Sequence, residues 1–325
     1  MAELLIATGN EFAHLEEGID RWTLRTALAG QGIRCLAVDP HETAVFYAGS
    51  DISGLWKSHD RGQTWQNLDL PEPTVYSVAV SPANGYLYAG TEPSKLFVSA
   101  DGGRSWSERP TLREIPSAPT WRFPPRPWTS HVRWIAPHPE DAQLLLVGIE
   151  LGGVMLSSDG GQTWLDHRPE AIKDAHQLAW HPRETKRAYE AGGGGTAWSD
   201  DYGQTWRRED QGREDHYVWA LAVDAHDPDK WFVAAAPSAS HAHYQPGEAR
   251  ATLYRWQGVG PWEALPALSK SRTVMPYALS MAGGRLFAGF ADGTIFSTPD
   301  DGDTWQGLIL EEGALKHIMA MIALA

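Results

Sequence analysis

One tryptophan-terminated phrase repeats along the chain and limits the folds that are open to it. The phrase Ser/Thr-x-Asp-x-Gly-x-Thr/Ser-Trp, called the repeat motif below, occurs five times, ending at Trp65, Trp106, Trp164, Trp206 and Trp305. Two degenerate copies, ending at Trp22 and Trp262, keep the tryptophan and lack the Asp-Gly spacing. Successive tryptophans lie 43, 41, 58, 42, 56 and 43 residues apart. A period of about 40 to 45 residues is typical of β-propeller blades.

The residues between the tryptophans indicate four short strands in each unit. Between residues 76 and 106 the apolar runs YSVAV, GYLYAG and KLFVSA precede the motif, and a fourth strand begins at its Ser-Trp end. Aspartate and glycine suit a hairpin turn, and tryptophan fills the wedge between neighbouring sheets. The sequence therefore predicts an all-β, seven-bladed β-propeller with four-stranded antiparallel blades.

The two ends of the chain are each incomplete as a blade. Residues 317–324 resemble a first strand with no second, and residues 3–25 resemble the other three strands. Joined, they make one blade and leave no exposed sheet edge. We therefore expect residues 1–325 to form a single propeller domain that closes through a shared blade.

Composition excludes several classes of partner. The formal net charge is -14, and no basic stripe is present, so neither nucleic acid nor an anionic membrane is expected as a partner. Cys35 is the single cysteine, residues 1–10 lack the pattern of a signal peptide, and no apolar run approaches the ~20 residues of a membrane span. These features predict a cytoplasmic protein.

The five intact motifs resemble the BNR/Asp-box repeat family of β-propellers. This family includes sialidases, some plant-polysaccharide hydrolases, sortilin-type receptors and a photosystem II assembly factor, so the resemblance implies the fold and leaves the activity open. The sialidases carry an Arg-Ile-Pro motif. The nearest string here is Glu114-Ile115-Pro116, and sialidase activity is therefore not expected.

Comparison of the predicted inner strands reveals one recurrent position at which every blade carries a large polar or aromatic residue. These residues are Arg34, Tyr76, Arg133, His176, Trp219, Tyr277 and His317. We expect them to surround the channel mouth on the face opposite the repeat motifs, where they either plug the channel or bind a ligand. The arginines favour a small polar or anionic ligand, because a guanidinium binds carboxylates and phosphates through two hydrogen bonds. Arg272 would add to this charge.

Histidines near the same face suggest catalysis and a metal. His131, His176 and His216 lie near the starts of consecutive inner strands, with Glu150 on an adjacent turn. This set would suit a divalent transition metal, Zn, Fe, Mn or Cu, although single histidines also serve as plain hydrogen-bonding residues. His241 and His243, expected to point together from an extended insertion, would complete or cap the site. As catalytic residues the sequence favours His176, Glu150 and His317.

Carboxylates and aromatic rings complete the predicted mouth. Acidic residues follow four second strands, namely Asp51, Glu92, Glu150 and Asp292, and two of them would serve as acid and base in glycoside hydrolysis. Glu92 is also a predicted ligand-binding residue. Trp121, Trp128 and Trp219 would stack on a sugar. The sequence thus favours a hydrolase- or lyase-type enzyme, with a non-catalytic scaffold for a protein partner as the alternative.

Overall fold

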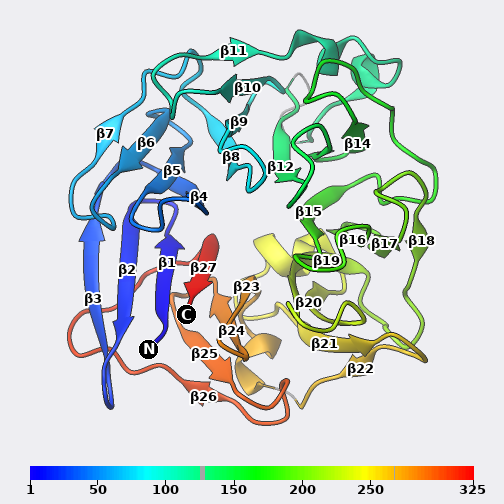
Figure 1. Ribbon diagram of the computed structural model, residues 1–325. Coiled ribbons are helices and arrows are strands. Elements are labelled where there is room, and N and C mark those ends of the chain that lie inside the picture. Colours follow the sequence, from blue (N-terminus) through cyan, green and yellow to red (C-terminus); the bar gives the residue numbers. More distant parts are fainter. Residues whose placement is uncertain (125–128, 267) are drawn as a thin grey trace.

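The computed structural model of the chain confirms a ring of seven antiparallel sheets around a central channel (Figure 1). It describes residues 1–124, 129–266 and 268–325. In blade 1 the order is β27-β1-β2-β3, and in the other blades the strands follow one another along the chain. Blade 4 has three strands, and a bridge between Leu156 and Leu165 marks the place of the fourth.

The strands have the following bounds, blade by blade. Blade 1 contains β27 (Ala320–Leu324), β1 (Glu3–Ala7), β2 (Phe12–Glu17) and β3 (Trp22–Ala27), and blade 2 contains β4 (Ile33–Val38), β5 (Phe46–Ser50), β6 (Leu55–Ser58) and β7 (Gln66–Asn67). Blade 3 contains β8 (Val75–Val80), β9 (Leu87–Thr91), β10 (Leu96–Ser99) and β11 (Ser107–Glu108). Blade 4 contains β12 (Val132–Pro137), β13 (Leu145–Ile149) and β14 (Gly153–Ser157). Blade 5 contains β15 (Ala175–Trp180), β16 (Ala188–Gly192), β17 (Gly195–Ser199) and β18 (Arg207–Arg208), blade 6 contains β19 (Tyr217–Val223), β20 (Lys230–Ala236), β21 (Thr252–Gln257) and β22 (Glu263–Ala264), and blade 7 contains β23 (Pro276–Ala282), β24 (Arg285–Phe290), β25 (Ile295–Thr298) and β26 (Gln306–Gly307).

The ring closes through blade 1, as the sequence predicted. Strand β27 pairs antiparallel with β1, from Glu3 opposite Leu324 to Ala7 opposite Ala320. Figure 1 shows the two termini side by side at this blade. The strand begins at Ala320 rather than at the predicted residue 317.

The repeat motifs form turns that are held by their own side chains. In the first intact copy the Gly62 amide donates to Ser58 Oγ at 2.8 Å, and Thr64 Oγ1 donates to Asp60 Oδ2 at 2.6 Å. These hydrogen bonds lower the pKa of Asp60 to about 2. The same hydroxyl-to-carboxylate bond recurs at Asp101, Asp159, Asp201 and Asp300. The motif is therefore a structural element of each of these blades.

The core lies between neighbouring sheets, as expected for a propeller. One buried cluster joins Tyr47 and Leu55 of blade 2 to Val75 and Leu87 of blade 3. Motif tryptophans reach the preceding blade, since the ring of Trp65 lies 4.9 Å from that of Phe12. Each fully buried aliphatic or aromatic side chain contributes ~1.5–3 kcal/mol to the stability of the ring.

Six of the seven inner strands share a β-bulge at the same level. In β4, β8, β12, β15, β19 and β23 the register against the next strand shifts by one residue, so that one residue has no partner opposite it. The bulged residues are Arg34, Tyr76, Arg133, His176, Trp219 and Tyr277. They are the residues that the sequence comparison selected in these six blades.

The seventh residue of that comparison was misplaced by two positions. In blade 1, Ile318 packs against Gly289 of blade 7 as Val75 of blade 3 packs against Gly49 of blade 2, so Ile318 corresponds to the residue before a bulge. Met319 therefore occupies the place predicted for His317. The error arose because the motif-free C-terminal segment was matched to β15 by its apolar pattern alone, in which a shift of two residues preserves the alternation of faces.

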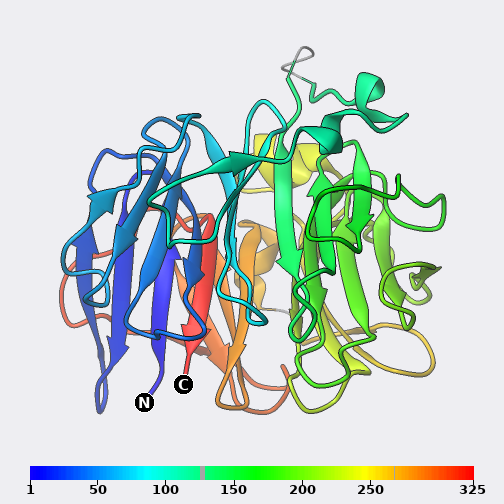
Figure 2. The ribbon, with the colours of Figure 1, turned by 45° about the horizontal axis from the view of Figure 1, so that its top comes forward.

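Both insertions lie at the end of the ring opposite the termini (Figure 2). The first carries two 3-10 turns, η1 (Pro110–Arg113) and η2 (Ala118–Thr120), and the second carries a π-helical turn, η3 (Ser240–Tyr244). A further 3-10 turn, η4 (Ser269–Arg272), precedes β23. Among the described residues, no helix is long and apolar enough to span a membrane.

Candidate functional site

A cavity of about 450 Å³ occupies the central channel, and all seven inner strands line it. The six bulged residues and Met319 contribute to its walls. Together these seven residues define what we call the channel mouth. The inward direction of the bulged side chains follows from the bulge itself, because the extra residue bends the strand and re-aims its side chain.

One side of the mouth is a stack of three planar groups. The guanidinium of Arg34 lies 3.6 Å from the centre of the Tyr76 ring, and this ring stacks on His131 with a centroid distance of 3.8 Å. Within the described part of the chain, Arg34 has no carboxylate within ion-pair distance. Its charge is therefore held in a fixed plane by the tyrosine and is available to a ligand.

His131 lies between two buried glutamates. Its Nε2 donates to Glu150 Oε2 at 2.6 Å, and its Nδ1 lies 3.3 Å from Glu92 Oε2. Burial raises the pKa of Glu150, but the His131 hydrogen bond and the nearby charges of His131 and Arg133 outweigh burial and lower this pKa to about 2. Glu150 is thus an ionised carboxylate at neutral pH.

Arg133 connects the glutamates to the aromatic side of the mouth. Its Nε lies 3.5 Å from Glu150 Oε2, and its guanidinium lies 4.7 Å from the centre of the Trp219 ring. Burial lowers the pKa of Arg133. The Nε atom is buried and has no hydrogen-bond acceptor among the residues described, so this cation is also incompletely satisfied by the protein.

His176 presents an unpaired nitrogen toward a carboxylate. Its Nδ1 donates to the Val218 carbonyl at 2.7 Å, which leaves the lone pair of a neutral imidazole on Nε2. This Nε2 lies 3.4 Å from Asp174 Oδ2. His176 is 0% exposed, and Nε2 has no hydrogen-bond partner in the described residues. One ligand atom each from Glu150, Asp174 and His176 lies within 4.8 Å of the others. We call these three residues the channel cluster.

His243 closes the aromatic side of the mouth from η3. The Tyr277 hydroxyl donates to the Ala242 carbonyl at 3.1 Å and must therefore accept from His243 Nδ1, which is 2.7 Å away. His243 Nε2 then accepts from the Tyr217 hydroxyl at 2.8 Å. Burial is the main cause that lowers the pKa of His243 to about 4. His243 is thus a neutral bridge between two tyrosines.

Other predicted histidines lie elsewhere. His216 is exposed, so the predicted grouping of His131, His176 and His216 does not form. His241 hydrogen-bonds Ser238 within its own turn, and it does not point with His243, because the insertion forms a π-helical turn instead of the extended segment that we predicted. His317 lies 5.5 Å from Tyr277 in ring distance and is held through Nδ1 by the Ala291 carbonyl.

The remaining predicted residues neither line the cavity nor join the channel cluster. Asp292 accepts from Thr294 in an exposed turn, and Asp51 is half-buried. Arg272 is exposed, and Trp121 packs against the blade 4 core and donates to Ser117 Oγ. Trp128 lies outside the described residues. The sequence places Asp174 two residues before His176 on the same face of the inner strand, but the prediction assigned Asp174 no role.

Comparisons with known proteins support the fold and leave the activity open. No protein-family profile and no curated protein matches the chain. Among solved structures it resembles the GH74 xyloglucanase from Xanthomonas campestris, with a TM-score of 0.72 and 16% identity over 99% of this chain and 52% of that one. An ancestral GH74 enzyme matches with a TM-score of 0.64 and 16% identity over 84% of this chain and 38% of that enzyme.

A third similar structure belongs to a different class of protein. It is YCF48 bound to D1 peptide, with a TM-score of 0.60 and 17% identity over 94% of this chain and 85% of YCF48. The chain spans about half or less of the length of the two GH74 enzymes. At these identities the likeness shows a seven-bladed propeller and nothing of its chemistry.

Proposed function

We propose that this protein binds a small anionic ligand at the channel mouth. The observation that carries the proposal is the state of Arg34, a cation that lies against Tyr76 in a 450 Å³ cavity and has no carboxylate partner among the described residues. Arg133, with its unsatisfied Nε, supplies a second positive group. Tyr76, Trp219 and Tyr277 add flat apolar surfaces, which suit a ligand with a ring or a sugar.

We further propose that the bound ligand is turned over in a hydrolase- or lyase-type reaction. The channel cluster would supply the reactive groups. Imidazole and carboxylate side chains, such as those of His176, Glu150 and Asp174, act as bases that take up protons in hydrolysis and elimination. His131 would position Glu150 through their 2.6 Å hydrogen bond, with Glu92 behind it. The five motif turns support assignment to the BNR/Asp-box repeat family, and the cytoplasmic location remains a prediction from the sequence.

The test of ligand binding uses the planar charge of Arg34. A panel of small carboxylates, sugar acids and sugar phosphates is screened by thermal shift, and hits are titrated by calorimetry against wild type, Arg34→Lys and Arg34→Ala. We expect affinity to fall about tenfold in Arg34→Lys, or about 1.4 kcal/mol, because lysine keeps the charge and loses the stacked plane. Arg34→Ala should lose more.

An exposed arginine of blade 1 provides the matched control. Arg21→Lys, at an exposed position away from the channel, should bind every hit like wild type. Binding by both Arg34 variants at wild-type affinity, or the absence of any anionic hit, would overturn the proposed function.

A second candidate is a non-catalytic, peptide-binding scaffold. It is favoured by the similarity to YCF48 bound to D1 peptide, which extends over most of both chains. The insertions carrying η1, η2 and η3 would then form the binding face together with the mouth (Figure 2). Peptides that bind in a library screen while no small anion produces a thermal shift would favour this function over the first.

A further inference from the structure

Two clusters of one histidine and two carboxylates occur among the described residues, and they differ in how completely they are paired. One is the channel cluster, Glu150, Asp174 and His176, and the other is Glu3, His14 and Glu16 of blade 1. In both, one candidate ligand atom from each residue lies within 4.8 Å of the other two. The chemistry of each depends on what else neutralises the converging lone pairs.

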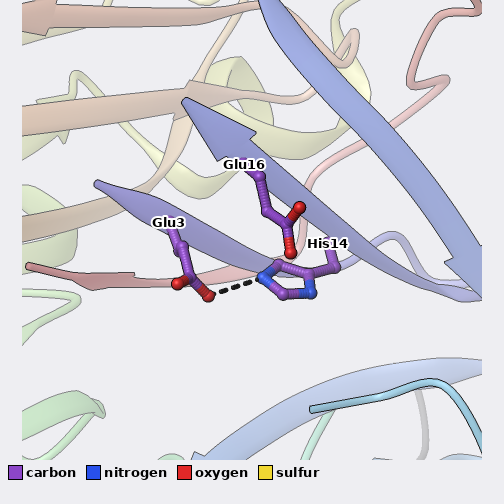
Figure 3. Close-up of side chains that lie close together, drawn as sticks. All are labelled: Glu3, His14 and Glu16. Atoms are coloured by element: carbon purple, nitrogen blue, oxygen red, sulfur yellow. Dashed lines mark hydrogen bonds and ion pairs between the residues drawn. The ribbon is translucent and has the colours of Figure 1, made fainter. Parts of the chain in front are cut away.

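The blade 1 cluster is fully paired, and Figure 3 shows the hydrogen bond between His14 and Glu3 within it. His14 Nε2 donates to Glu3 Oε2 at 2.9 Å, and His14 Nδ1 accepts from Arg25 Nη2 at 2.9 Å. Arg25 also pairs with Glu16 at 2.7 Å, and Arg61 pairs with Glu3. Both ring nitrogens have partners and both carboxylates have a guanidinium. This cluster is therefore complete without any ion.

The channel cluster lacks such compensation on one side. The ring of His176 is fixed by the bond between Nδ1 and the Val218 carbonyl, so its buried Nε2 points at Asp174 Oδ2, 3.4 Å away, and has no hydrogen-bond partner among the described residues. The other carboxylate oxygen, Asp174 Oδ1, is buried without a hydrogen-bond partner among the residues described. A lone pair facing a carboxylate oxygen in a buried site is repulsive unless a positive charge lies between them.

The surroundings of the channel cluster match those of metal ligands in proteins. A ligating histidine usually donates its other N–H to a carbonyl or carboxylate, as His176 does. A ligating carboxylate is itself hydrogen-bonded, as Glu150 is by His131. The charge of Arg133, 3.5 Å from Glu150, partly neutralises the cluster and lowers its affinity for a cation.

We propose that Glu150, Asp174 and His176 bind one divalent transition cation in the channel. One imidazole nitrogen and two carboxylate oxygens favour Mn²⁺, Fe²⁺, Co²⁺ or Zn²⁺ over softer ions, and three protein ligands leave further coordination positions for water or a ligand. Open positions are what a catalytic metal site requires. The inference rests on the proposed function for the purpose of the cation, but its binding is independent of any ligand.

The experiment titrates Co²⁺ and Zn²⁺ into tag-free protein that has been stripped with chelator and dialysed. Calorimetry gives stoichiometry and affinity, and the visible absorption of Co²⁺ reports its ligands. Wild type should bind one equivalent, and Asp174→Asn and His176→Gln should each lose about 100-fold in affinity, because each removes a ligand atom that the site needs. Circular dichroism spectra of the variants are compared with that of wild type to check that they fold.

The blade 1 cluster supplies the matched control. Glu16→Gln should bind Co²⁺ and Zn²⁺ like wild type, since its cluster holds no ion. The inference is overturned if wild type binds no better than Asp174→Asn, if Glu16→Gln loses the metal, or if neither ion binds and His176 is an imidazolium at neutral pH by NMR. Calorimetry of small anions against Arg34 variants tests the proposed function separately, so either can fail alone.

Discussion

The channel cluster and the blade 1 cluster use the same three kinds of ligand atom in opposite ways. In blade 1, Arg25 and Arg61 bring two guanidinium groups to two carboxylates, and both nitrogens of His14 are hydrogen-bonded. In the channel, Arg133 is the cation near the cluster, and His176 Nε2 is unpaired. The difference shows that residue type alone does not make a site. What matters is whether the surrounding protein has already matched each lone pair.

The largest expected effect tests whether the ring closes through blade 1, the blade that carries Glu3, His14 and Glu16. Deletion of residues 317–325 removes β27 and leaves β1 with an unpaired edge. We expect loss of the cooperative thermal transition, measured by circular dichroism and calorimetry. A truncated protein that melts cooperatively near the wild-type temperature would contradict closure through this blade.

A smaller effect tests the structural role of His14 directly. His14 is 1% exposed. Its replacement by alanine removes the hydrogen bonds that it makes with Glu3 and with Arg25. We expect His14→Ala to reduce the free energy of unfolding by about 2 kcal/mol in urea titrations. Glu248→Ala, on an exposed loop, serves as the control and should have no effect. A neutral His14→Ala would show that the cluster is not structural.

The same cluster predicts a pH dependence of stability. Burial lowers the pKa of His14. Glu3 is half-buried, which by itself raises its pKa, but the hydrogen bonds from Arg61 and His14 outweigh this effect and lower the pKa of Glu3. A folded-state pKa below the unfolded value stabilises the protein above the unfolded pKa, and this contribution is lost as the pH falls, from about 6.5 for His14 and about 4.3 for Glu3. Wild type should lose more unfolding free energy than His14→Gln between pH 7 and pH 5, measured by urea titration at each pH. An equal loss would contradict this assignment.

The smallest effect has the opposite sign and concerns the channel. In metal-free protein, Asp174→Asn removes a carboxylate that faces the lone pair of His176, so we expect stability equal to wild type or higher by up to ~1 kcal/mol. With Co²⁺ at about 100 times its dissociation constant, wild type alone should gain about 2.7 kcal/mol. Differential scanning calorimetry with and without Co²⁺ measures both. A destabilised metal-free Asp174→Asn would make Asp174 a structural residue like Glu3.

The seven-bladed ring and its shared blade were predictable from the sequence, because the motif tryptophans have a fixed period and the two ends of the chain complement each other. The level of the channel mouth was also predictable in six blades, where a large polar or aromatic residue stands at one position. The sequence did not reveal that this position is a bulge. Bulges depend on how each inner strand twists against its neighbour, and single-sequence patterns do not record that.

The site residues that the sequence predicted wrongly were misplaced for separate physical reasons. Met319 replaces the predicted His317 because alternation alone could not distinguish registers two residues apart. His216 and His131 do not join His176, since each histidine's direction depends on contacts between blades that sequence spacing does not encode. His241 and His243 diverge because the insertion forms a π-helical turn. The pairing of Asp174 with His176 required knowledge of which oxygen and nitrogen remain unmatched.

The recurrent bulge has a consequence for how recognition can diversify in this ring. A residue with no partner opposite it in the ladder can be exchanged without altering the pairing of the strands on either side. Each of the six bulged blades therefore offers one position at which binding chemistry can change while folding is left largely intact. A new specificity would need a few substitutions around one circle, which makes this propeller a suitable starting point for redesign as well as for natural divergence.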